Sequence, residues 1–336
     1  MKVLINCPVP FLLAHGGAQI QIEQTLAALN HAGVEAEPLR WWEGAQKADL
    51  IHYWGRMPAG HIQLARQKGI KVVIGELLTA TGSRSPSQLR VQKLISRTVE
   101  RLAPRSFINA FNWDAYRLAD AVIAMTPWEK HLMTYLFGAA PEKIHIVPNG
   151  VEEVFLTAPK TDCGPWLVCT ATITERKRVL ELARAAVHAQ TPLWIIGRAY
   201  AESDPYARQF HALAKEHPQL LCTDSPPLAD RAGLAKIYRA ARGFVLLSAM
   251  ETRSLAAEEA AACECPLLLS DLPWARTTFE TAASYCPVTD RVETTARALR
   301  AFYDAAPGLP RPPKPPTWNE IGRQLKTIYE QVLNRR

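Results

Sequence analysis

Short apolar runs alternate with amphipathic segments along the first half of the chain. Residues 18–32 place isoleucine and leucine at helical spacing, which predicts a helix with one buried face. Short, mainly apolar runs predict buried strands at 2–5, 34–39, 48–53, 70–74, 118–125 and 143–147. Further helices are expected at 61–68, 87–102 and 127–138. Strands that alternate with helices are typical of a parallel, doubly wound sheet.

The second half of the chain repeats this alternation. Strands are predicted at 166–170, 192–196, 220–222, 244–247 and 266–269, and helices at 178–189, 205–216, 230–241, 256–263 and 294–305. The polar stretch 150–163 marks a domain boundary, and a proline-rich stretch, 307–316, precedes a terminal helix at 318–333. The sequence therefore predicts an α/β protein with two doubly wound domains, 1–152 and 160–312.

The composition narrows the class of protein. The chain has 336 residues, of which 48% are apolar and 21% charged, a balance typical of globular proteins with buried cores. No apolar run reaches the roughly 18 residues that span a bilayer. The seven cysteines form no zinc-binding or redox pattern. We therefore expect a cytoplasmic protein with reduced thiols.

The net charge of +7 gathers partly on one predicted helix. Basic residues share a face there and extend beyond both ends: Arg84, Arg90, Lys93, Arg97, Arg101 and Arg105. An apolar stripe runs beside them: Val91, Leu94, Ile95, Thr98 and Leu102. Simple solvation is one interpretation. The other is attraction to an anionic membrane surface or to a phosphorylated acceptor. No nucleic-acid motif is present, so nucleic acid is not expected as a partner.

Two glutamates with seven residues between them, Glu251 and Glu259, surround a strand–loop–helix junction. Such a junction presents backbone N–H groups and the positive end of a helix dipole, which favours an anion. Carboxylates on either side could accept hydrogen bonds from hydroxyl groups. A nucleotide-sugar has this order of groups: hydroxyls, diphosphate, hydroxyls. The alternative is that Glu251 caps the helix and Glu259 is a solvated helix residue.

Several stretches in the right order resemble one family. They are His15-Gly16-Gly17 before a helix, 120–127 (DAVIAMTP), 143–151 (KIHIVPNGV), 174–179 (TERKRV) and 251–259 (ETRSLAAEE). Together they resemble a retaining glycosyltransferase of family 4, which has the GT-B fold of two Rossmann-like domains facing across a cleft. The resemblance covers nearly the whole chain. It implies that the terminal helix, 317–336, crosses back to the N-terminal, acceptor-binding domain.

The resemblance also implies an activity and a set of site residues. The protein would move a sugar from a nucleotide-diphosphate donor to a glycan, lipid-linked or other acceptor. The implied catalytic residues are Glu251, Lys177 and Glu76. The implied donor-binding residues are Gly16, Gly17, Arg176, Lys177, Gly197, Arg198, Leu228, Glu251, Thr252, Arg253, Ser254, Leu255 and Glu259. The sequence contains no Asp-x-Asp, so we expect a metal-independent enzyme with no cofactor beyond the nucleotide-sugar, working in the cytoplasm or at the inner face of the membrane.

The sequence departs from the family pattern at three places. Thr252-Arg253-Ser254 stands where the family has Gly-Phe-Gly, Thr172 replaces an arginine, and Glu76 follows a strand that usually ends in histidine. Arg253 could supply a phosphate contact, and Arg176 or Arg178 could replace the lost charge. Two alternatives stay open: a non-catalytic GT-B-like subunit that binds a nucleotide-sugar or a partner, and an enzyme of the nucleotide-sugar epimerase type.

Overall fold

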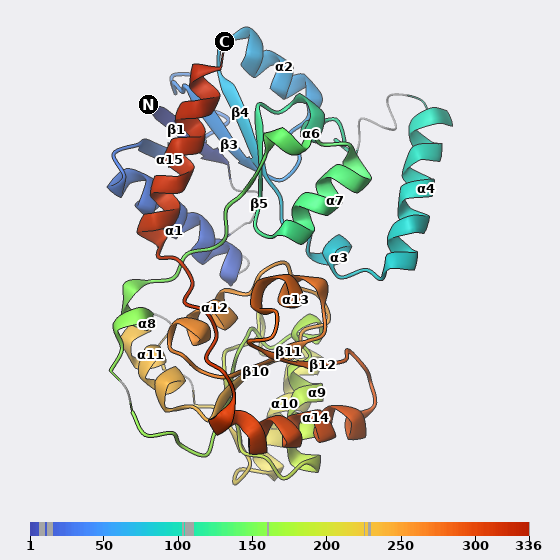
Figure 1. Cartoon of the computed structure of the whole chain (residues 1–336), viewed down its shortest axis with the longest axis vertical. Helices are drawn as coiled ribbons and strands as arrows, with labels where there is room; N and C mark the ends of the chain where they lie inside the picture. Colours follow the sequence, from blue (N-terminus) through green and yellow to red (C-terminus); the bar gives the residue numbers. More distant parts are fainter. Residues whose placement is uncertain are drawn as a thin grey trace. The chain divides into compact units, whose positions relative to one another are not determined.

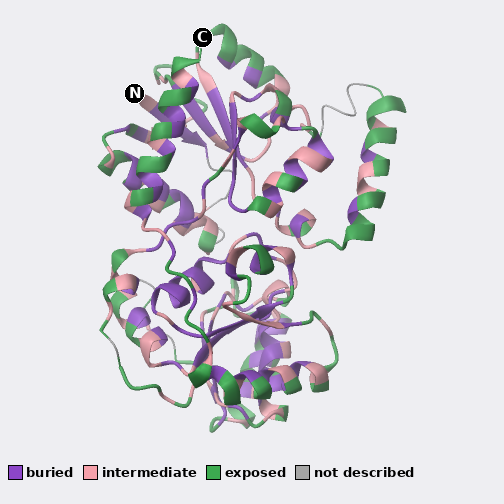
Figure 2. Ribbon diagram, viewed as in Figure 1, coloured by how far each residue is buried: buried purple, intermediate pink, exposed green. Residues whose placement is uncertain are grey.

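The computed structural model describes residues 1–6, 11, 16–102, 104, 111–159, 161–224, 226–227 and 230–335. It contains two parallel sheets of six strands, each flanked by helices (Figure 1). The strands are mostly buried, and the helices expose one side to solvent (Figure 2). This confirms the predicted fold class of two doubly wound α/β halves.

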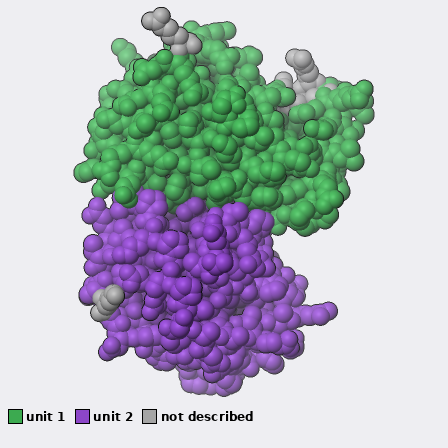
Figure 3. Space-filling model, viewed as in Figure 1, with its two compact units in different colours: residues 1–150, 318–336 green, residues 151–317 purple. Residues whose placement is uncertain are grey.

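The chain forms two compact units (Figure 3). Unit 1 contains Met1–Gly150 and Trp318–Arg336, and unit 2 contains Val151–Thr317. The chain passes between the units twice. Within unit 2, the two passing segments pair as a short parallel bridge, in which Val151 N–H donates to the Pro316 carbonyl at 2.9 Å.

The sheet of unit 1 has the strand order β2-β1-β3-β4-β5-β6. Its strands are β1 (Lys2–Asn6), β2 (Glu35–Pro38), β3 (Leu50–Trp54), β4 (Lys71–Gly75), β5 (Ala121–Ala124) and β6 (Ile144–Ile146). Strand β2 lies on one side of β1, and β3 starts the series on the other side. The strand order therefore reverses between β1 and β3, where open α/β sheets bind ligands beyond the carboxyl ends of the strands.

The helices of unit 1 include the terminal helix of the chain. They are α1 (Gly17–His31), α2 (Ala59–Gln67), α3 (Thr79–Gly82), α4 (Pro86–Leu102), α6 (Ala115–Leu118), α7 (Pro127–Phe137) and α15 (Trp318–Asn334), with a 3-10 turn, η1 (Pro141–Lys143). Helix α15 packs against α1 so closely that a Cβ on Gly322 would lie 2.4 Å from the Ala28 carbonyl oxygen. His52 of β3 is fully buried, and its Nδ1 forms a hydrogen bond of 2.7 Å with the Tyr329 hydroxyl of α15. The terminal helix is thus part of the core of unit 1.

Unit 2 has the strand order β12-β11-β10-β7-β8-β9. Its strands are β7 (Leu167–Thr170), β8 (Leu193–Ile196), β9 (Leu221–Cys222), β10 (Gly243–Leu246), β11 (Leu267–Ser270) and β12 (Ser284–Cys286). Its helices are α8 (Glu153–Thr157), α9 (Val179–His188), α10 (Pro205–Glu216), α11 (Arg231–Ala240), α12 (Leu255–Ala262), α13 (Pro273–Phe279) and α14 (Val292–Ala305), with 3-10 turns η2 (Glu175–Lys177) and η3 (Ala306–Gly308). Here the order reverses between β7 and β10.

Two differences from the sequence prediction have a clear cause. The apolar run 118–125 was expected to be one strand, but α6 ends at Leu118 and β5 begins at Ala121, because the run continues through the end of a helix. Helix α13 and strand β12 were missed. Both elements are short. The sequence marks α13 mainly by the proline in its first turn, and the structure shows that its Trp274 is buried.

Among the described residues, no helix is both long enough and apolar enough to cross a membrane.

Candidate active site

Two loops of unit 2 meet at the carboxyl ends of the central strands. One follows β7 and contains η2, and the other follows β10 and leads into α12. The Ala249 N–H donates to the Arg176 carbonyl at 2.8 Å and so joins the loops. Because β7 and β10 flank the reversal of strand order, these loops lie where a doubly wound sheet offers a binding crevice.

The first cluster at this point surrounds Glu251. Its carboxylate forms ion pairs with the Lys177 ammonium group and, at 3.3 Å, with the Arg176 guanidinium group. The Arg176 guanidinium also donates to the Met250 carbonyl at 3.0 Å. Burial by itself would raise the pKa of Glu251, but the two positive charges outweigh it and hold the pKa below its ordinary value. The structure therefore brings together three predicted site residues and keeps Glu251 ionised.

Helix α12 begins immediately after this cluster. Ser254 is its N-cap, and the Ser254 hydroxyl accepts from the Ala257 N–H at 3.3 Å. The alternative in which Glu251 caps the helix is therefore wrong. The Arg253 guanidinium pairs with the Glu258 carboxylate at 2.6 Å, and both side chains are largely buried. Burial raises the pKa of Glu258, and Arg253 opposes the rise.

The second carboxylate of the motif, Glu259, lies on α12 and is 5% exposed. The alternative of a solvated helix residue is therefore wrong. It pairs with Arg231 at the start of α11, and Arg231 also pairs with Glu152 at 2.7 Å. The Arg231 guanidinium lies 4.8 Å from the centre of the Phe155 ring. Burial raises the pKa of Glu259 to about 7, although Arg231 opposes it. The two carboxylates of the motif thus have pKa values shifted in opposite directions.

Gly197 and Arg198 follow β8, beside the loop after β7. Gly197 has φ of +156°, and a Cβ there would lie 1.9 Å from the Ala171 carbonyl oxygen. Only glycine fits, because the two loops approach each other backbone to backbone. Arg198 is exposed, and its carbonyl accepts from the Ile173 N–H at 3.1 Å. Leu228 lies outside the described residues.

The predicted residues of unit 1 fall in two places. Gly16 is the N-cap of α1, with φ of +149°, and Gly17 is its first residue; His15 lies outside the described residues. Glu76 follows β4 and pairs with Arg56 at 2.8 Å. It also accepts from the Tyr116 hydroxyl. Burial raises the pKa of Glu76, and Arg56 opposes the rise.

Two tryptophans lie on a loop that follows β2 of unit 1. Trp41 is 50% and Trp42 86% exposed. The Trp41 indole N–H donates to the Asn6 side chain at 3.0 Å, at the end of β1. Its ring centre lies 5.5 Å from that of His61. Trp41 therefore lies at the carboxyl end of the sheet, beside the reversal of strand order in unit 1.

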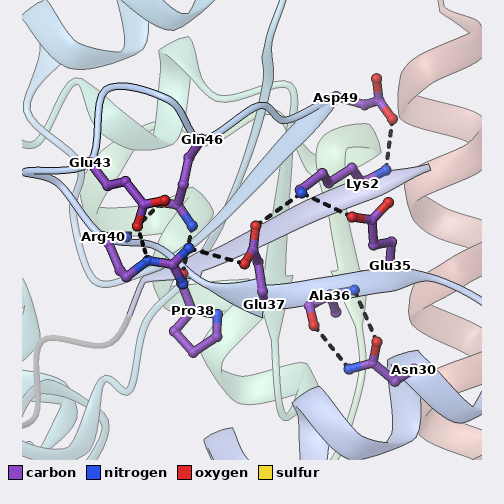
Figure 4. A network of polar contacts seen from close by, with 10 residues as sticks. All are labelled: Lys2, Asn30, Glu35, Ala36, Glu37, Pro38, Arg40, Glu43, Gln46 and Asp49. Atoms are coloured by element: carbon purple, nitrogen blue, oxygen red, sulfur yellow. Dashed lines mark hydrogen bonds and ion pairs between the residues drawn. The ribbon is translucent and has the colours of Figure 1, made fainter.

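A polar network holds this loop on the edge of the sheet (Figure 4). The Gln46 side chain accepts from the Arg40 N–H at 2.8 Å and donates to the Pro38 carbonyl at 3.1 Å. The Arg40 guanidinium pairs with Glu37 at 3.2 Å and with Glu43. These bonds connect the residues just before the tryptophans in the sequence with those just after them. Specific contacts therefore hold the loop that carries the two rings.

Sequence reasoning missed the partners of Glu259 and Glu76. Arg231, Arg56 and Tyr116 come from distant parts of the chain, and no local pattern marks them. The adjacent tryptophans were a signal that could have been used. Arg178, expected as a possible replacement charge, instead pairs with Asp290 at 2.9 Å, away from Glu251.

Comparisons with known proteins agree with this architecture. Residues 25–154 match the family model for Glycosyltransferase Family 4. A D-inositol 3-phosphate glycosyltransferase of Jonesia denitrificans is 29% identical over 246 residues, which is 63% of this chain and 57% of that protein. The chain thus matches little more than half the length of this curated relative.

Solved structures of low sequence identity share the fold over the whole chain. Sucrose-phosphate synthase from Thermosynechococcus elongatus has a TM-score of 0.65 at 18% identity, with all of both chains covered. The Anabaena protein Alr3699/HepE, in complex with UDP and glucose, has a TM-score of 0.64 at 14% identity, covering 99% of this chain and 98% of that one. The chain therefore has the GT-B fold, and its family match and its relative make it similar to glycosyltransferases of family 4.

Proposed function

We propose that the protein is a retaining glycosyltransferase that uses a nucleotide-diphosphate sugar as donor. One observation carries the proposal. Glu251, Lys177 and Arg176 converge from two loops at the reversal of strand order in unit 2, next to the N-terminus of α12. A carboxylate, two cations and a helix N-terminus at a ligand-binding edge match the groups of a sugar diphosphate.

In the proposed reaction, an acceptor hydroxyl oxygen forms a bond with the anomeric carbon of the donor sugar. The bond from that carbon to the diphosphate oxygen breaks, and the diphosphate leaves with the electron pair. The hydroxyl proton goes to the departing diphosphate. Lys177 and Arg176 lower the barrier because they neutralise the charge that grows on the leaving group. These cations supply the positive charge, so the proposal requires no metal ion.

The remaining residues receive roles that fit their surroundings. Ionised Glu251 accepts hydrogen bonds from the transferred sugar, and Glu259 accepts from the ribose hydroxyls. The backbone from Thr252 to Leu255 faces the phosphates. Gly197 lets the loop after β8 lie against the loop after β7, and these two loops would form the pocket for the base. Each role depends on a carboxylate or a backbone group that the fold holds in place.

Unit 1 is proposed to bind the acceptor, a glycan or a lipid-linked sugar. Glu76 is held by Arg56 and has a raised pKa. We assign it the role of orienting the acceptor hydroxyl through a hydrogen bond, while the hydroxyl proton goes to the departing diphosphate. Gly16 gives the start of α1 a backbone without a side chain, which a substrate could approach closely. The exposed rings of Trp41 and Trp42 offer flat apolar faces for a sugar ring.

A thermal-shift screen against UDP-, GDP- and ADP-sugars, followed by a transfer assay, tests the proposal. One nucleotide class should raise the melting temperature, because a ligand that binds only the folded state stabilises it. Glu251→Gln and Lys177→Met should lower kcat about 100-fold or more, as the loss of preorganised charge predicts. Glu216→Gln and Lys215→Met change exposed residues of α10 and serve as matched controls.

The possible outcomes separate the proposal from its alternatives. Transfer to an acceptor with an unchanged anomeric configuration supports it. Nucleotide binding without transfer or donor hydrolysis indicates a non-catalytic subunit, and a changed sugar formed from donor alone indicates an epimerase. If no nucleotide raises the melting temperature and no sugar is transferred, the proposal is wrong.

A further inference from the structure

Helix α4 of unit 1 is amphipathic, and its apolar face points away from the protein. Its buried side consists of Leu89 and Ser96, which are 4% and 7% exposed. The helix contacts α7 on this side, where the Lys93 ammonium lies 3.5 Å from the centre of the Tyr135 ring. A surface helix normally turns its apolar stripe toward the core.

The outward stripe is formed by four large apolar side chains. Val91 is 57%, Leu94 68%, Ile95 57% and Leu102 77% exposed. At 3.6 residues per turn they fall within an arc of about 100° of the helix surface. Figure 2 shows green, exposed surface along much of this helix. A continuous exposed stripe of this kind indicates a surface that another apolar phase covers.

Three exposed arginines, Arg90, Arg97 and Arg101, lie along one flank of the stripe. Within the described part of the chain, no carboxylate forms an ion pair with any of them. Residues 84–102 contain five basic side chains and one acidic side chain, Glu100, so the segment carries a net charge of +4. Unneutralised cations beside an apolar stripe complement a surface in which anionic groups lie over an apolar layer.

We propose that α4 docks the protein on an anionic lipid bilayer. The stripe from Val91 to Leu102 enters the boundary between headgroups and acyl chains, and the arginines bind lipid phosphates. Because the arginines lie on one flank only, the contact also fixes the rotation of the helix about its axis. The proposal is independent of sugar transfer, since vesicle binding requires neither donor nor acceptor.

Charge also argues against two other occupants. In a two-fold dimer through α4, the cationic segment of one copy would face that of the other, and like charges would repel. A nucleic acid would satisfy the arginines but would leave Leu94 and Ile95 exposed. An anionic bilayer satisfies both sets of side chains.

Co-sedimentation of the full chain with phosphatidylcholine vesicles, with and without phosphatidylglycerol, tests the proposal. Wild type should bind the anionic vesicles and lose affinity as salt is added. Arg97→Gln should lower the partition coefficient about fivefold, the factor for one basic residue near an anionic bilayer. Leu94→Asn combined with Ile95→Asn should lower it about tenfold or more.

Matched controls change exposed residues elsewhere. Leu64→Asn on α2 and Arg208→Gln on α10 should leave vesicle binding unchanged. All variants should melt at the wild-type temperature, because the changed side chains are exposed. Equal binding to neutral vesicles, no binding, or unchanged binding by the α4 variants would overturn the proposal. A change of oligomeric state in sedimentation velocity, without a change in vesicle binding, would overturn it in favour of a protein partner.

Discussion

Glu259 offers a quantitative test of the proposed donor site through pH. Its carboxyl is 5% exposed, and burial raises its pKa to about 7. A ribose hydroxyl donates its hydrogen bond to a carboxylate, so the donor should bind the ionised form. Below its pKa the carboxyl carries a proton, and only a fraction of the protein is then competent to bind.

The magnitude follows from that fraction. The apparent Kd is the intrinsic Kd divided by the ionised fraction. With a pKa of about 7, the ionised fraction is about nine-tenths at pH ~8 and about one-tenth at pH ~6. The donor affinity should therefore fall about tenfold between these two pH values, which corresponds to about 1.4 kcal/mol. Arg231 remains charged throughout this range.

Isothermal titration with the nucleotide-sugar chosen by the screen measures this dependence. The intact donor is suitable because its diphosphate bridge has no proton to exchange in this range. Glu259→Gln should bind more weakly than wild type at high pH and should show a flat profile. Glu216→Gln, on the surface of α10, should keep the wild-type profile. A flat wild-type profile, or the same slope in Glu259→Gln, would refute the assignment of Glu259 to the ribose.

Three further predictions concern stability and the acceptor. The raised pKa of Glu259 gives the folded protein stability that is fully present below pH ~4.5 and is lost as the pH rises through ~7. The unfolding free energy of Glu259→Gln, relative to that of wild type, should therefore rise by about 3 kcal/mol over that pH range. Urea denaturation measures this difference. Gly197→Ala should lower the melting temperature of unit 2 and weaken donor binding, because its Cβ would overlap the Ala171 carbonyl; a wild-type melting curve would contradict the close approach. Trp42→Ala should raise the KM for a glycan acceptor without changing the KM for donor, whereas Leu64→Ala should change neither; an unchanged acceptor KM would remove Trp42 from the acceptor site.

The fold could be predicted from the sequence because its signal is local. Most of the buried parallel strands lie in short, mainly apolar runs, and the helices between them have apolar residues at helical spacing. The predicted strand at 192–196 and helix at 205–216 differ from β8 and α10 by no more than a residue at an end. The exceptions, such as the run 118–125, occur where an apolar helix end and a strand are continuous in the sequence.

The site could be predicted only in part, because a motif identifies residues within one stretch of sequence and not their partners on distant elements. The Glu251–Glu259 motif marked the two carboxylates and the helix between them, and 174–179 supplied Lys177 and Arg176. Arg231 was missed because it lies on α11, where a lone arginine after an aspartate resembles any helix start. Long-range pairing depends on how elements pack, and a pattern of spacing within one element does not contain it.

The outward direction of the α4 stripe was also beyond the sequence. Val91, Leu94 and Ile95 were recognised as a stripe, but periodicity does not say which side of a helix faces the core. Burial in the structure shows which side faces the core, because Leu89 and Ser96 occupy the inner face of α4. A stripe that would ordinarily be assigned to the core thus becomes a candidate binding surface.

Charge pairing in unit 2 suggests an order in which a donor would replace internal contacts. Glu251 is paired with Lys177 and Arg176, which avoids an unpaired buried charge. Lys177 is the more deeply held of the two cations, with its side chain 14% exposed against 39% for Arg176. A guanidinium has five N–H donors, and the hydrogen bonds of Arg176 to the Met250 carbonyl and Glu251 both use one nitrogen, Nη1. Arg176 can therefore bind an incoming diphosphate while it keeps these bonds, and it is the more exposed of the two cations. We infer that Arg176 makes the first phosphate contact and that Lys177 acts on the leaving group once the donor sugar has engaged Glu251.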